Sequence, residues 1–570
     1  MAALMRTSNR NYAATVPFVE ALAHLGLRHV AITPGSRNTP LAFAFAANET
    51  IVDTSHHDER SAAFFALGMA KATGIPVAVV STSGTAAAEY LPAAVEAKNA
   101  RVPLIILTAD RPQELRDVGA PQTINQSGIY GGAVKWAYEA PVPEATDEIV
   151  AAFAELAGRA WSAALDTPAG PVHINFPFRE PMAPTSIPGQ VPPDLRTPLY
   201  PSYFAAAPLS PSSEAIRQTV VALEGKRALI VAGPTDDPDL APAIADLADA
   251  VACPIIADPL SGLRTGGCSH NAVIASGDWL ARRGDLDREL LPEVVIRFGA
   301  PPTSKSVNSW LAANPGVRQI VVDDSAWRDP GASASTILRA NGVTVARALA
   351  DAVSPVDPGW LDSWSSADEA IASILDVPFP SEPALVQTLN DRLPDGSLLY
   401  VASSMPIRII DAYFRPTQTD LRILGNRGAN GIDGFISSAL GAATGTGRPT
   451  FAYSGDLSLL HDLTALATAG RLEIPLTIVL VNNDGGGIFH LLPQADYPEW
   501  FERHLGTPHG LDFARISEAF GIEHHLPADQ TELADLISTP ANATRIIELQ
   551  TDRDESANLL RSMWKRIANS

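Results

Sequence analysis

Short apolar runs alternate with Ala- and Leu-rich stretches along most of the chain. In the first third, strand-like runs lie at residues 28–33, 51–55, 76–81 and 103–108, most of them followed by turns rich in small or polar residues. Helical stretches follow at residues 39–47 and 85–99. The repeated order of strand, turn and helix predicts parallel sheets that carry helices on both faces.

The same alternation restarts twice further along the chain. Strand-like runs lie at residues 227–232, 253–257, 293–298 and 318–322, and again at 398–402, 449–453 and 475–481. Proline-rich segments separate the three groups, at residues 176–201 and around 353–360 and 376–383. Because proline disfavours helix interiors and central strands, these segments read as linkers or breaks. We therefore expect three doubly wound, parallel-sheet α/β domains, at residues 1–185, 200–350 and 380–570.

Charge and composition exclude several classes of protein. The 570 residues include 41 Lys+Arg and 63 Asp+Glu, a formal net charge of −22, which argues against a nucleic-acid or anionic-membrane surface. The two cysteines, Cys253 and Cys268, exclude a disulfide framework and a cysteine-rich metal site. No signal peptide and no apolar run of about 18 residues is visible, so we expect a cytoplasmic enzyme without a membrane span.

The motifs SGDLS and VNNDGGG carry the strongest chemical signal. Asp456 follows one predicted strand and Asn483 follows the next, so a single crossover brings both side chains to the same edge of a parallel sheet. A carboxylate, an amide oxygen and the carbonyl of Gly485 form a set of oxygen ligands that suits Mg²⁺. The glycines at 485–487 let the backbone approach a diphosphate. Either motif alone would more often be a helix cap or a turn, but together they favour a diphosphate–metal site.

This pair of motifs resembles the diphosphate-binding signature of the thiamine-diphosphate (ThDP) enzymes, which begins GDG and ends NN. Here GDL stands in place of GDG. Seven segments together resemble one branch of these enzymes, the 2-succinyl-5-enolpyruvyl-6-hydroxy-3-cyclohexene-1-carboxylate (SEPHCHC) synthases: TPGSRNTPLAFA, HDERSAAFFALG, TSGTA, LTADRPQEL, GNRGANGIDG, SGDLSLLHD and VNNDGGGIFHLLP. The resemblance covers both outer domains densely and the middle domain thinly.

The resemblance implies a particular division of labour among the domains. The first domain would bind the pyrimidine ring of ThDP, and the last would bind its diphosphate together with Mg²⁺, for which Mn²⁺ can substitute. The two halves of such a site usually come from different subunits. We therefore expect an obligate homodimer with active sites at the interface, or a dimer of such dimers.

The resemblance also assigns residues to the cofactor. Glu59 would be the catalytic carboxylate at the aminopyrimidine ring, although by itself it would be read as an acid stabilised at a helix N-terminus. Ile432 would wedge between the two cofactor rings, with ordinary core packing as the alternative. The other implied cofactor residues are Ser83, Gly84, Thr85, Asp456, Leu457, Ser458, Asn483, Gly485, Gly486, Gly487, Ile488 and Phe489, of which Asp456, Asn483 and Gly485 would hold the metal.

The implied reaction is the decarboxylation of 2-oxoglutarate and the 1,4-addition of the resulting carbanion to isochorismate, a step of menaquinone biosynthesis. Both substrates are dicarboxylates, which arginine binds with its planar, bidentate fork. Arginines lie at or just past predicted strand ends, where open α/β sheets bind ligands. The implied substrate residues are Ser36, Arg37, Arg111, Gln122, Lys305, Ser404, Arg408 and Arg427. Ser306 follows Lys305 where some relatives have arginine, and a solvated surface lysine is an equally good reading of Lys305.

Two other functions stay open at this point. The chain could be another ThDP-dependent decarboxylase or carboligase, similar to acetohydroxyacid synthase; GDL in place of GDG and the arginine set argue against this. It could also be a non-catalytic protein with the ThDP fold; the presence of Glu59, Asp456 and Asn483 argues against that. The adjacent His56 and His57 have no third ligand at metal spacing and are read as local structure, and His461 could belong to a core or to a site.

Overall fold

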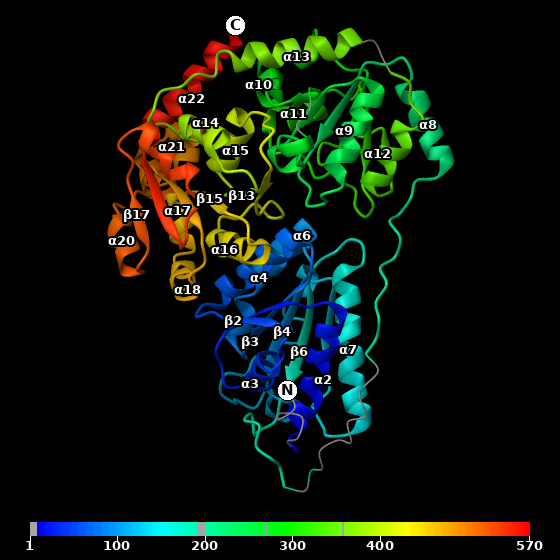
Figure 1. Ribbon diagram of the computed structural model, residues 1–570, viewed down its shortest axis with the longest axis vertical. Helices are drawn as coiled ribbons and strands as arrows, with labels where there is room; N and C mark the ends of the chain where they lie inside the picture. The colour runs from blue at the N-terminus through cyan, green and yellow to red at the C-terminus, as the bar shows by residue number, and fades with distance from the viewer. Residues whose placement is uncertain (1–7, 189, 191–199, 269–270, 356–357, 570) are drawn as a thin grey trace. The chain divides into compact units, whose positions relative to one another are not determined.

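Three parallel, six-stranded sheets organise the protein, which confirms the predicted fold class (Figure 1). The computed structural model describes residues 8–188, 190, 200–268, 271–355 and 358–569. The chain forms two compact units. The first comprises Met1–Ala206, Asn426–Gly447 and His461–Ile474, and the second comprises Ala207–Gly425, Arg448–Leu460 and Pro475–Ser570.

The first unit contains the sheet with strand order β2-β1-β3-β4-β6-β5. Its strands are β1 (His29–Ile32), β2 (Val52–Ser55), β3 (Val77–Ser81), β4 (Leu104–Asp110), β5 (Trp136–Glu139) and β6 (Val172–Pro177). Every residue of β3 and β4 is buried, as expected for the central strands of a parallel sheet that is covered on both faces. Helices α2 (Arg10–Leu25) and α7 (Asp147–Leu165) pack against each other, and both contribute to the core that includes this sheet.

Two further helices of the first unit cross at very short range. Helix α4 (Glu59–Thr73) lies against α16 (Phe435–Thr446), a helix more than 360 residues further along the chain (Figure 1). A Cβ atom on Gly68 would lie 2.0 Å from the backbone oxygen of Ser438, and one on Gly441 would lie 1.9 Å from that of Phe65. Only glycine at these two positions allows the backbones to approach so closely.

The second unit contains the other two sheets, with strand orders β12-β11-β10-β7-β8-β9 and β14-β13-β15-β16-β18-β17. The first of these consists of β7 (Ala228–Ala232), β8 (Ile255–Ala257), β9 (Val273–Ile274), β10 (Val294–Phe298), β11 (Arg318–Val322) and β12 (Thr336–Leu338). The other consists of β13 (Ser397–Val401), β14 (Leu421–Leu424), β15 (Thr450–Gly455), β16 (Thr477–Asn482), β17 (Glu523–His525) and β18 (Arg545–Gln550). One apolar core, which includes Trp279, Trp364 and Tyr413, is shared by elements of both sheets.

A buried ion pair also joins these two sheet layers. The side chain of Arg264 is 2% exposed, and its Nη2 lies 2.8 Å from Oδ1 of Asp411. The same guanidinium donates to the carbonyl oxygens of Ala257 at 2.8 Å and Phe414 at 3.1 Å. These hydrogen bonds satisfy a charge that would otherwise be costly to bury.

The structure corrects two details of the sequence-based prediction. The single helix expected at residues 85–99 is two helices, α5 (Thr85–Ala88) and α6 (Leu91–Ala100). Pro92, the second residue of α6, has no N–H group and is tolerated only in the first turn of a helix, so a new helix begins there. The proline-rich segment expected as a linker from residue 176 begins inside β6, which runs to Pro177. Residues 189 and 191–199 of that segment, and 356–357 of the next predicted break, lie outside the described residues.

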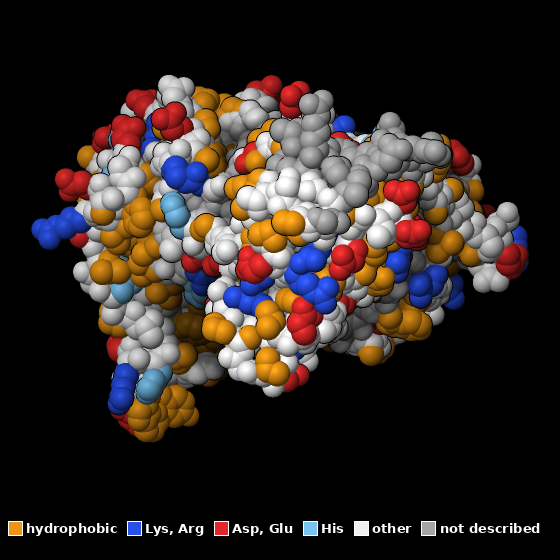
Figure 2. All heavy atoms as spheres, turned by 90° about the horizontal axis from the view of Figure 1, so that it is seen from below, with side chains coloured by type: hydrophobic (Ala, Val, Ile, Leu, Met, Phe, Trp, Pro, Cys, Tyr) orange, Lys and Arg blue, Asp and Glu red, His pale blue; other side chains and the backbone are white. Residues whose placement is uncertain are grey.

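The surface carries both acidic and basic side chains, as the composition of the sequence leads one to expect. Acidic and basic side chains are interspersed on the face shown in Figure 2. Among the residues that the structure describes, no helix combines the length and the apolar character needed to cross a membrane.

The close crossing of α4 and α16 gives a first testable prediction. Gly68→Ala should lower the free energy of unfolding by about 2 kcal/mol or more, because a methyl group would overlap backbone atoms that cannot move aside without separating the helices. Gly132→Ala is the matched control, since a Cβ atom there has no neighbour within 4 Å, and it should change stability by less than about 0.5 kcal/mol. Urea unfolding followed by fluorescence and circular dichroism measures both; equal midpoints would contradict the prediction.

Candidate functional site

A polar pocket of about 560 Å³ lies beside the carboxyl ends of the strands in the first unit. The turn after β3, the start of α4 and a loop after β4 supply its walls. The lining residues are Asp58, Glu59, Arg60, Thr82, Ser83, Thr85, Ala86, Glu89 and Gln122. Four residues that the sequence assigns to the site, Glu59, Ser83, Thr85 and Gln122, therefore line one cavity, at the edge where open α/β sheets bind ligands.

Glu59 is the first residue of α4 and is half-buried at this pocket. Asp58 caps the helix by accepting a hydrogen bond from the N–H of Ser61 at 2.9 Å. Burial raises the pKa of Glu59, a hydrogen bond with Thr33 acts in the opposite direction, and the charges of Asp58 and Glu89 raise it further. A carboxyl group with a raised pKa in a cleft is suited to proton transfer.

A second buried carboxylate holds the turn on which Glu59 lies. Asp462 accepts hydrogen bonds from the Ser61 hydroxyl at 3.1 Å and from the N–H and hydroxyl of Ser437 at 2.7 and 3.0 Å. Burial raises the pKa of Asp462 to about 6. The hydroxyl of Thr464 donates to Asp58 at 3.2 Å, so the first turn of α4 is attached at two points to residues that follow α17 (Asp456–His461).

The histidines near this turn have structural partners. His461 lies beside Arg60, whose Nη2 donates to its carbonyl oxygen at 2.5 Å. His56 is buried against Phe65, with 4.7 Å between ring centroids, and burial lowers its pKa to about 3. In the described parts of the chain, no group of three or more His, Cys, Asp or Glu side chains is arranged to hold a metal.

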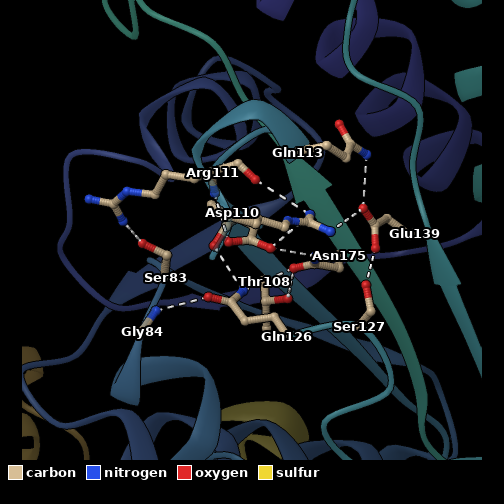
Figure 3. A network of polar contacts seen from close by, with 12 residues as sticks. Ser83, Gly84, Thr108, Asp110, Arg111, Gln113, Gln126, Ser127, Glu139 and Asn175 are labelled. Atoms are coloured by element: carbon tan, nitrogen blue, oxygen red, sulfur yellow. Dashed lines mark hydrogen bonds and ion pairs between the residues drawn. The ribbon is translucent and has the colours of Figure 1, made fainter. Parts of the chain in front are cut away.

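Arg111 forms a small polar ring with two other predicted site residues, Ser83 and Gln122; Figure 3 shows its contact with Ser83. Its Nη1 donates to the hydroxyl of Ser83 and, at 2.8 Å, to the carbonyl oxygen of Gln122. The side-chain amide of Gln122 donates to the carbonyl oxygen of Ser83 at 2.9 Å. Gly84, between Ser83 and α5, has φ +84°, a backbone conformation that side-chain-bearing residues rarely adopt.

Arg37 carries a second positive charge near Arg111. Burial lowers the pKa of Arg111, and the charge of Arg37 lowers it further. Arg37 donates to the carbonyl oxygen of Phe178 at 3.0 Å and forms a 3.1 Å ion pair with Glu180, a partner that the sequence did not indicate. Ser36, just before it, is exposed.

The loop with Arg427 and Ile432 is fastened to α6. Glu96 is only 3% exposed, and its carboxylate accepts hydrogen bonds from the N–H groups of Gly428 at 2.7 Å and Ala429 at 2.6 Å. Arg427 and Ile432 are both half-buried. Sequence reasoning missed Glu96 because an acid inside a predicted helix normally faces solvent.

In the second unit, the structure brings the predicted metal residues together. Strands β15 and β16 are parallel neighbours, with Gly455 opposite Val481, so Asp456 and Asn483 follow the same sheet edge. Oδ2 of Asp456 accepts hydrogen bonds from the N–H groups of Asn483 at 3.1 Å and Gly485 at 2.9 Å. Gly485 has φ +133°, and a Cβ atom there would lie 2.1 Å from the oxygen of Gly506, so this loop requires glycine.

The donor set at this edge fits a hard divalent cation. Oδ1 of Asn483 is buried and has no hydrogen-bond partner among the described residues, and an unpartnered buried oxygen is costly unless a ligand binds it. Two residues beside it were not predicted. His509 Nε2 lies 3.3 Å from Oδ2 of Asp456, and the buried Glu382 hydrogen-bonds with Asn483. Burial raises the pKa of Glu382 to about 7, and the charge of Asp456 contributes to the rise. Glu382 looks in sequence like an ordinary first-turn acid of α14 (Glu382–Arg392), so no local signal distinguishes it.

The remaining predicted residues also lie in the second unit. Leu457 and Ser458 follow Asp456 in α17, and Gly486 donates to the carbonyl oxygen of Gly506 at 2.7 Å. Gly487, Ile488 and Phe489 belong to the 3₁₀ helix η6 (Gly487–Leu491).

Three predicted substrate residues of this unit lie on other elements. Ser404, with φ +73°, precedes α15 (Met405–Tyr413), and Arg408 on that helix donates to its carbonyl oxygen. Lys305 is the exposed first residue of α11 (Lys305–Ala313).

The fold and the two sites define a class of enzyme, and comparison with known proteins identifies that class. The family model described as "Thiamine pyrophosphate enzyme, N-terminal TPP binding domain" matches residues 14–129, and "Thiamine pyrophosphate enzyme, C-terminal TPP binding domain" matches residues 410–546. "Middle domain of thiamine pyrophosphate" matches residues 202–401. A solved structure from Mycobacterium smegmatis, described as a candidate thiamin diphosphate-dependent enzyme, has a TM-score of 0.72 at 19% identity and covers 95% of this chain and 99% of its own. That likeness shows the shared fold.

Curated relatives narrow the class. The 2-succinyl-5-enolpyruvyl-6-hydroxy-3-cyclohexene-1-carboxylate synthase of Geobacillus thermodenitrificans is 43% identical, with 97% of this chain and 95% of the relative aligned. The protein of the same name from Chloroflexus aurantiacus is 42% identical over the same shares of the two chains. The chain belongs to the SEPHCHC synthase family of thiamine-diphosphate enzymes.

The unpartnered oxygen of Asn483 generates a prediction that does not depend on turnover. Asn483→Ala should weaken Mn²⁺ binding in the presence of ThDP by roughly tenfold or more, because it removes a buried oxygen ligand. Loss of the free Mn²⁺ signal in electron paramagnetic resonance gives the affinity. Asn308→Ala serves as the control, since it removes two hydrogen bonds to backbone oxygens, at 2.6 and 2.8 Å, on a different element. Equal Mn²⁺ affinity in the two variants would exclude Asn483 as a ligand.

Proposed function

We propose that this chain catalyses the ThDP-dependent decarboxylation of 2-oxoglutarate and the 1,4-addition of the resulting succinyl-semialdehyde carbanion to isochorismate. The products are 2-succinyl-5-enolpyruvyl-6-hydroxy-3-cyclohexene-1-carboxylate and CO₂, in menaquinone biosynthesis. The chain is 43% identical to a SEPHCHC synthase over 97% of its length. The observation that carries the proposal is that such a chain contains both halves of the site. These halves are Glu59 at its pocket and the Asp456–Asn483 pair at its sheet edge.

Each half of the site has a separate task in this proposal. Asp456, Asn483 and the carbonyl of Gly485 would hold Mg²⁺, and the glycine-rich turn would accept the diphosphate. Thiamine diphosphate, when bound, supplies a nucleophilic carbon and an electron sink that no amino-acid side chain provides. Glu59 would hydrogen-bond the aminopyrimidine ring and hold a proton there, with its pKa raised by burial. Ile432 would support the bent cofactor between its two rings.

The substrate carboxylates would be bound by the arginine groups. Arg111 and Arg37 lie close enough for the charge of Arg37 to lower the pKa of Arg111, while the charges of Asp110 and Glu180 act in the opposite direction. A dicarboxylate would relieve that repulsion and pair with the planar guanidinium groups. Ser36, Gln122, Ser404, Arg408 and Arg427 would add contacts.

We also propose the assembly and the division of the chain that the family implies. Residues 1–185 would form the pyrimidine-binding domain, 200–350 the central domain and 380–570 the diphosphate domain. Glu59 belongs to the first compact unit and Asp456 to the second. Because the two halves of the site usually come from different subunits in ThDP enzymes, two copies of the chain would complete each site. A cytoplasmic location stays a prediction from the sequence.

The direct test is a reconstitution with defined components. Purified protein, ThDP, Mg²⁺, 2-oxoglutarate and isochorismate should consume isochorismate, and consumption should stop when 2-oxoglutarate is omitted. Mass spectrometry should identify the cyclohexene carboxylate product. Consumption of 2-oxoglutarate with isochorismate left intact, or consumption of pyruvate supplied in its place, would indicate a different ThDP enzyme and overturn the proposal.

Glu59→Gln tests the role of the carboxylate separately from binding. We expect kcat to fall by roughly 10²- to 10⁴-fold, the usual contribution of a general acid–base group, while ThDP still binds. Glu155→Gln, an exposed acid in the same unit, is the control for loss of one negative charge. A Glu59→Gln enzyme with near-normal kcat would remove the catalytic role from this residue.

A further inference from the structure

A fully buried side chain, Gln126, joins three segments of the first unit (Figure 3). Its Oε1 accepts a hydrogen bond from the N–H of Gly84 at 2.9 Å. Its Nε2 donates to the carbonyl oxygen of Ala109 at 3.2 Å and to Oδ1 of Asn175 at 2.9 Å. One amide thus connects the turn after β3, the end of β4 and strand β6, and every one of its hydrogen-bonding groups has a partner of the correct polarity.

The neighbouring carboxylate of Asp110 completes this hub. It is fully buried, and it accepts hydrogen bonds from the N–H of Arg111 at 2.7 Å, the amide of Asn175 at 2.9 Å and the guanidinium of Arg116 at 2.9 Å. Asn175 therefore donates to Asp110 and accepts from Gln126, which fixes the orientation of its amide. We call Asp110, Asn175 and Gln126 the buried hub.

The polar ring of the candidate substrate site is attached to this hub through the main chain. Arg111 directly follows Asp110, and its N–H is one of the donors to that carboxylate. Ser83 precedes Gly84, whose N–H is held by Gln126. Gln122 lies in the same loop as Gln126, four residues before it. The hub therefore sets the positions of Arg111, Ser83 and Gln122 relative to one another, without lining the pocket itself.

We propose that Gln126 is a positioning residue for substrate-carboxylate recognition, acting through Gly84 and Asn175 on the Arg111–Ser83–Gln122 ring. This inference rests on the proposed function, because it concerns the binding of the dicarboxylate substrates. Bidentate recognition of a carboxylate depends on guanidinium position, and a displacement of about 1 Å is enough to lower activity by roughly 100-fold. Groups that bind a ligand need neighbours that lock them in place.

Gln126→Glu tests the proposal by replacing one hydrogen-bond donor, the Nε2 group of Gln126, with an acceptor oxygen. The variant keeps an acceptor for the N–H of Gly84 but places a carboxylate oxygen against two acceptors, the oxygens of Ala109 and Asn175. In steady-state assays we expect the KM for one or both dicarboxylate substrates to rise roughly 10- to 100-fold, with a smaller change in kcat. The dissociation constant for ThDP, measured by calorimetry, should change less than the substrate KM values, since Gly84 is the only assigned cofactor residue to which Gln126 hydrogen-bonds and the diphosphate–metal residues lie in the other unit.

Gln319→Glu is the matched control for a purely structural effect. Gln319 is also fully buried, and its Nε2 donates to the carbonyl oxygen of Leu311 at 2.7 Å, so the substitution places an acceptor against an acceptor there as well. The control should lower the melting temperature while the KM values stay unchanged. If both variants change KM and kcat alike, Gln126 acts only on folding and the proposal is wrong.

The outcomes separate this inference from the proposed function. Wild-type activity with unchanged KM values in a folded Gln126→Glu enzyme would overturn the positioning role and leave the proposed function intact. A wild-type protein that does not consume isochorismate would overturn both. If Gln126→Glu does not fold, Gln126→Met removes the same hydrogen bonds without adding a charge, and the same rise in KM is expected of it; unchanged KM values in that variant would overturn the positioning role.

Discussion

Buried carboxylates that accept backbone N–H groups hold the loops on which the candidate site residues lie. Asp456 accepts two N–H groups from the turn after β16, and Glu96 accepts two from the loop that carries Arg427. Asp462 and Asp110 each accept one, from Ser437 in the first turn of α16 and from Arg111 after β4. The ends of parallel strands leave such groups without ladder partners, and burying them unpaired would cost about 1–3 kcal/mol each. Charge-assisted hydrogen bonds satisfy these groups and fix the loops at the same time.

The glycine-mediated crossing of α4 and α16 makes part of this arrangement possible. Ser437 on α16 and Ser61 on α4 donate to the same carboxylate, that of Asp462. Both serines can reach it only because the two helices approach at Gly68 and Gly441, where any side chain would overlap backbone. The position of Glu59, two residues before Ser61, therefore depends on helix packing several turns away from the pocket. Stability and site geometry are coupled here through van der Waals contact as well as through hydrogen bonds.

The sequence predicted the parts of the fold that local patterns encode. Continuous β-branched runs such as those of β3, β4 and β10 were predicted as buried strands within a few residues of their ends. The runs that form β15 and β16 placed Asp456 and Asn483 at one sheet edge, because strand ends and a crossover can be predicted from a sequence. Strands such as β5, β17 and β18 were not predicted. Strand β17 has only three residues, among them His524 and His525, and this composition does not favour a strand; its hydrogen bonds with β18 stabilise it instead.

The buried acceptors escaped sequence analysis for a different reason. Glu96 and its partners Gly428 and Ala429 are 332 and 333 residues apart, and Ser61 and Asp462 are 401 apart. Nothing in the local sequence distinguishes such an acid from one that faces solvent, because its role depends on tertiary structure. The family resemblance supplied the residues expected to touch cofactor and substrate, whereas the residues that hold them in place emerge only from the structure.

The net charge of −22 and the proposed anionic substrates are reconciled by the surroundings of the arginines. Arg37 is 12% exposed and its ion-pair partner Glu180 is 68% exposed. An ion pair with one exposed, solvated partner contributes only about 0–1 kcal/mol, so Glu180 would yield to a substrate carboxylate at little cost. The Arg111 guanidinium donates to two neutral oxygens, those of Ser83 and Gln122, so neither of these hydrogen bonds cancels its charge. The carboxylate of Asp110, beside this ring, accepts hydrogen bonds from the N–H of Arg111 and from the guanidinium of Arg116, so its charge is shared with donors other than the Arg111 guanidinium.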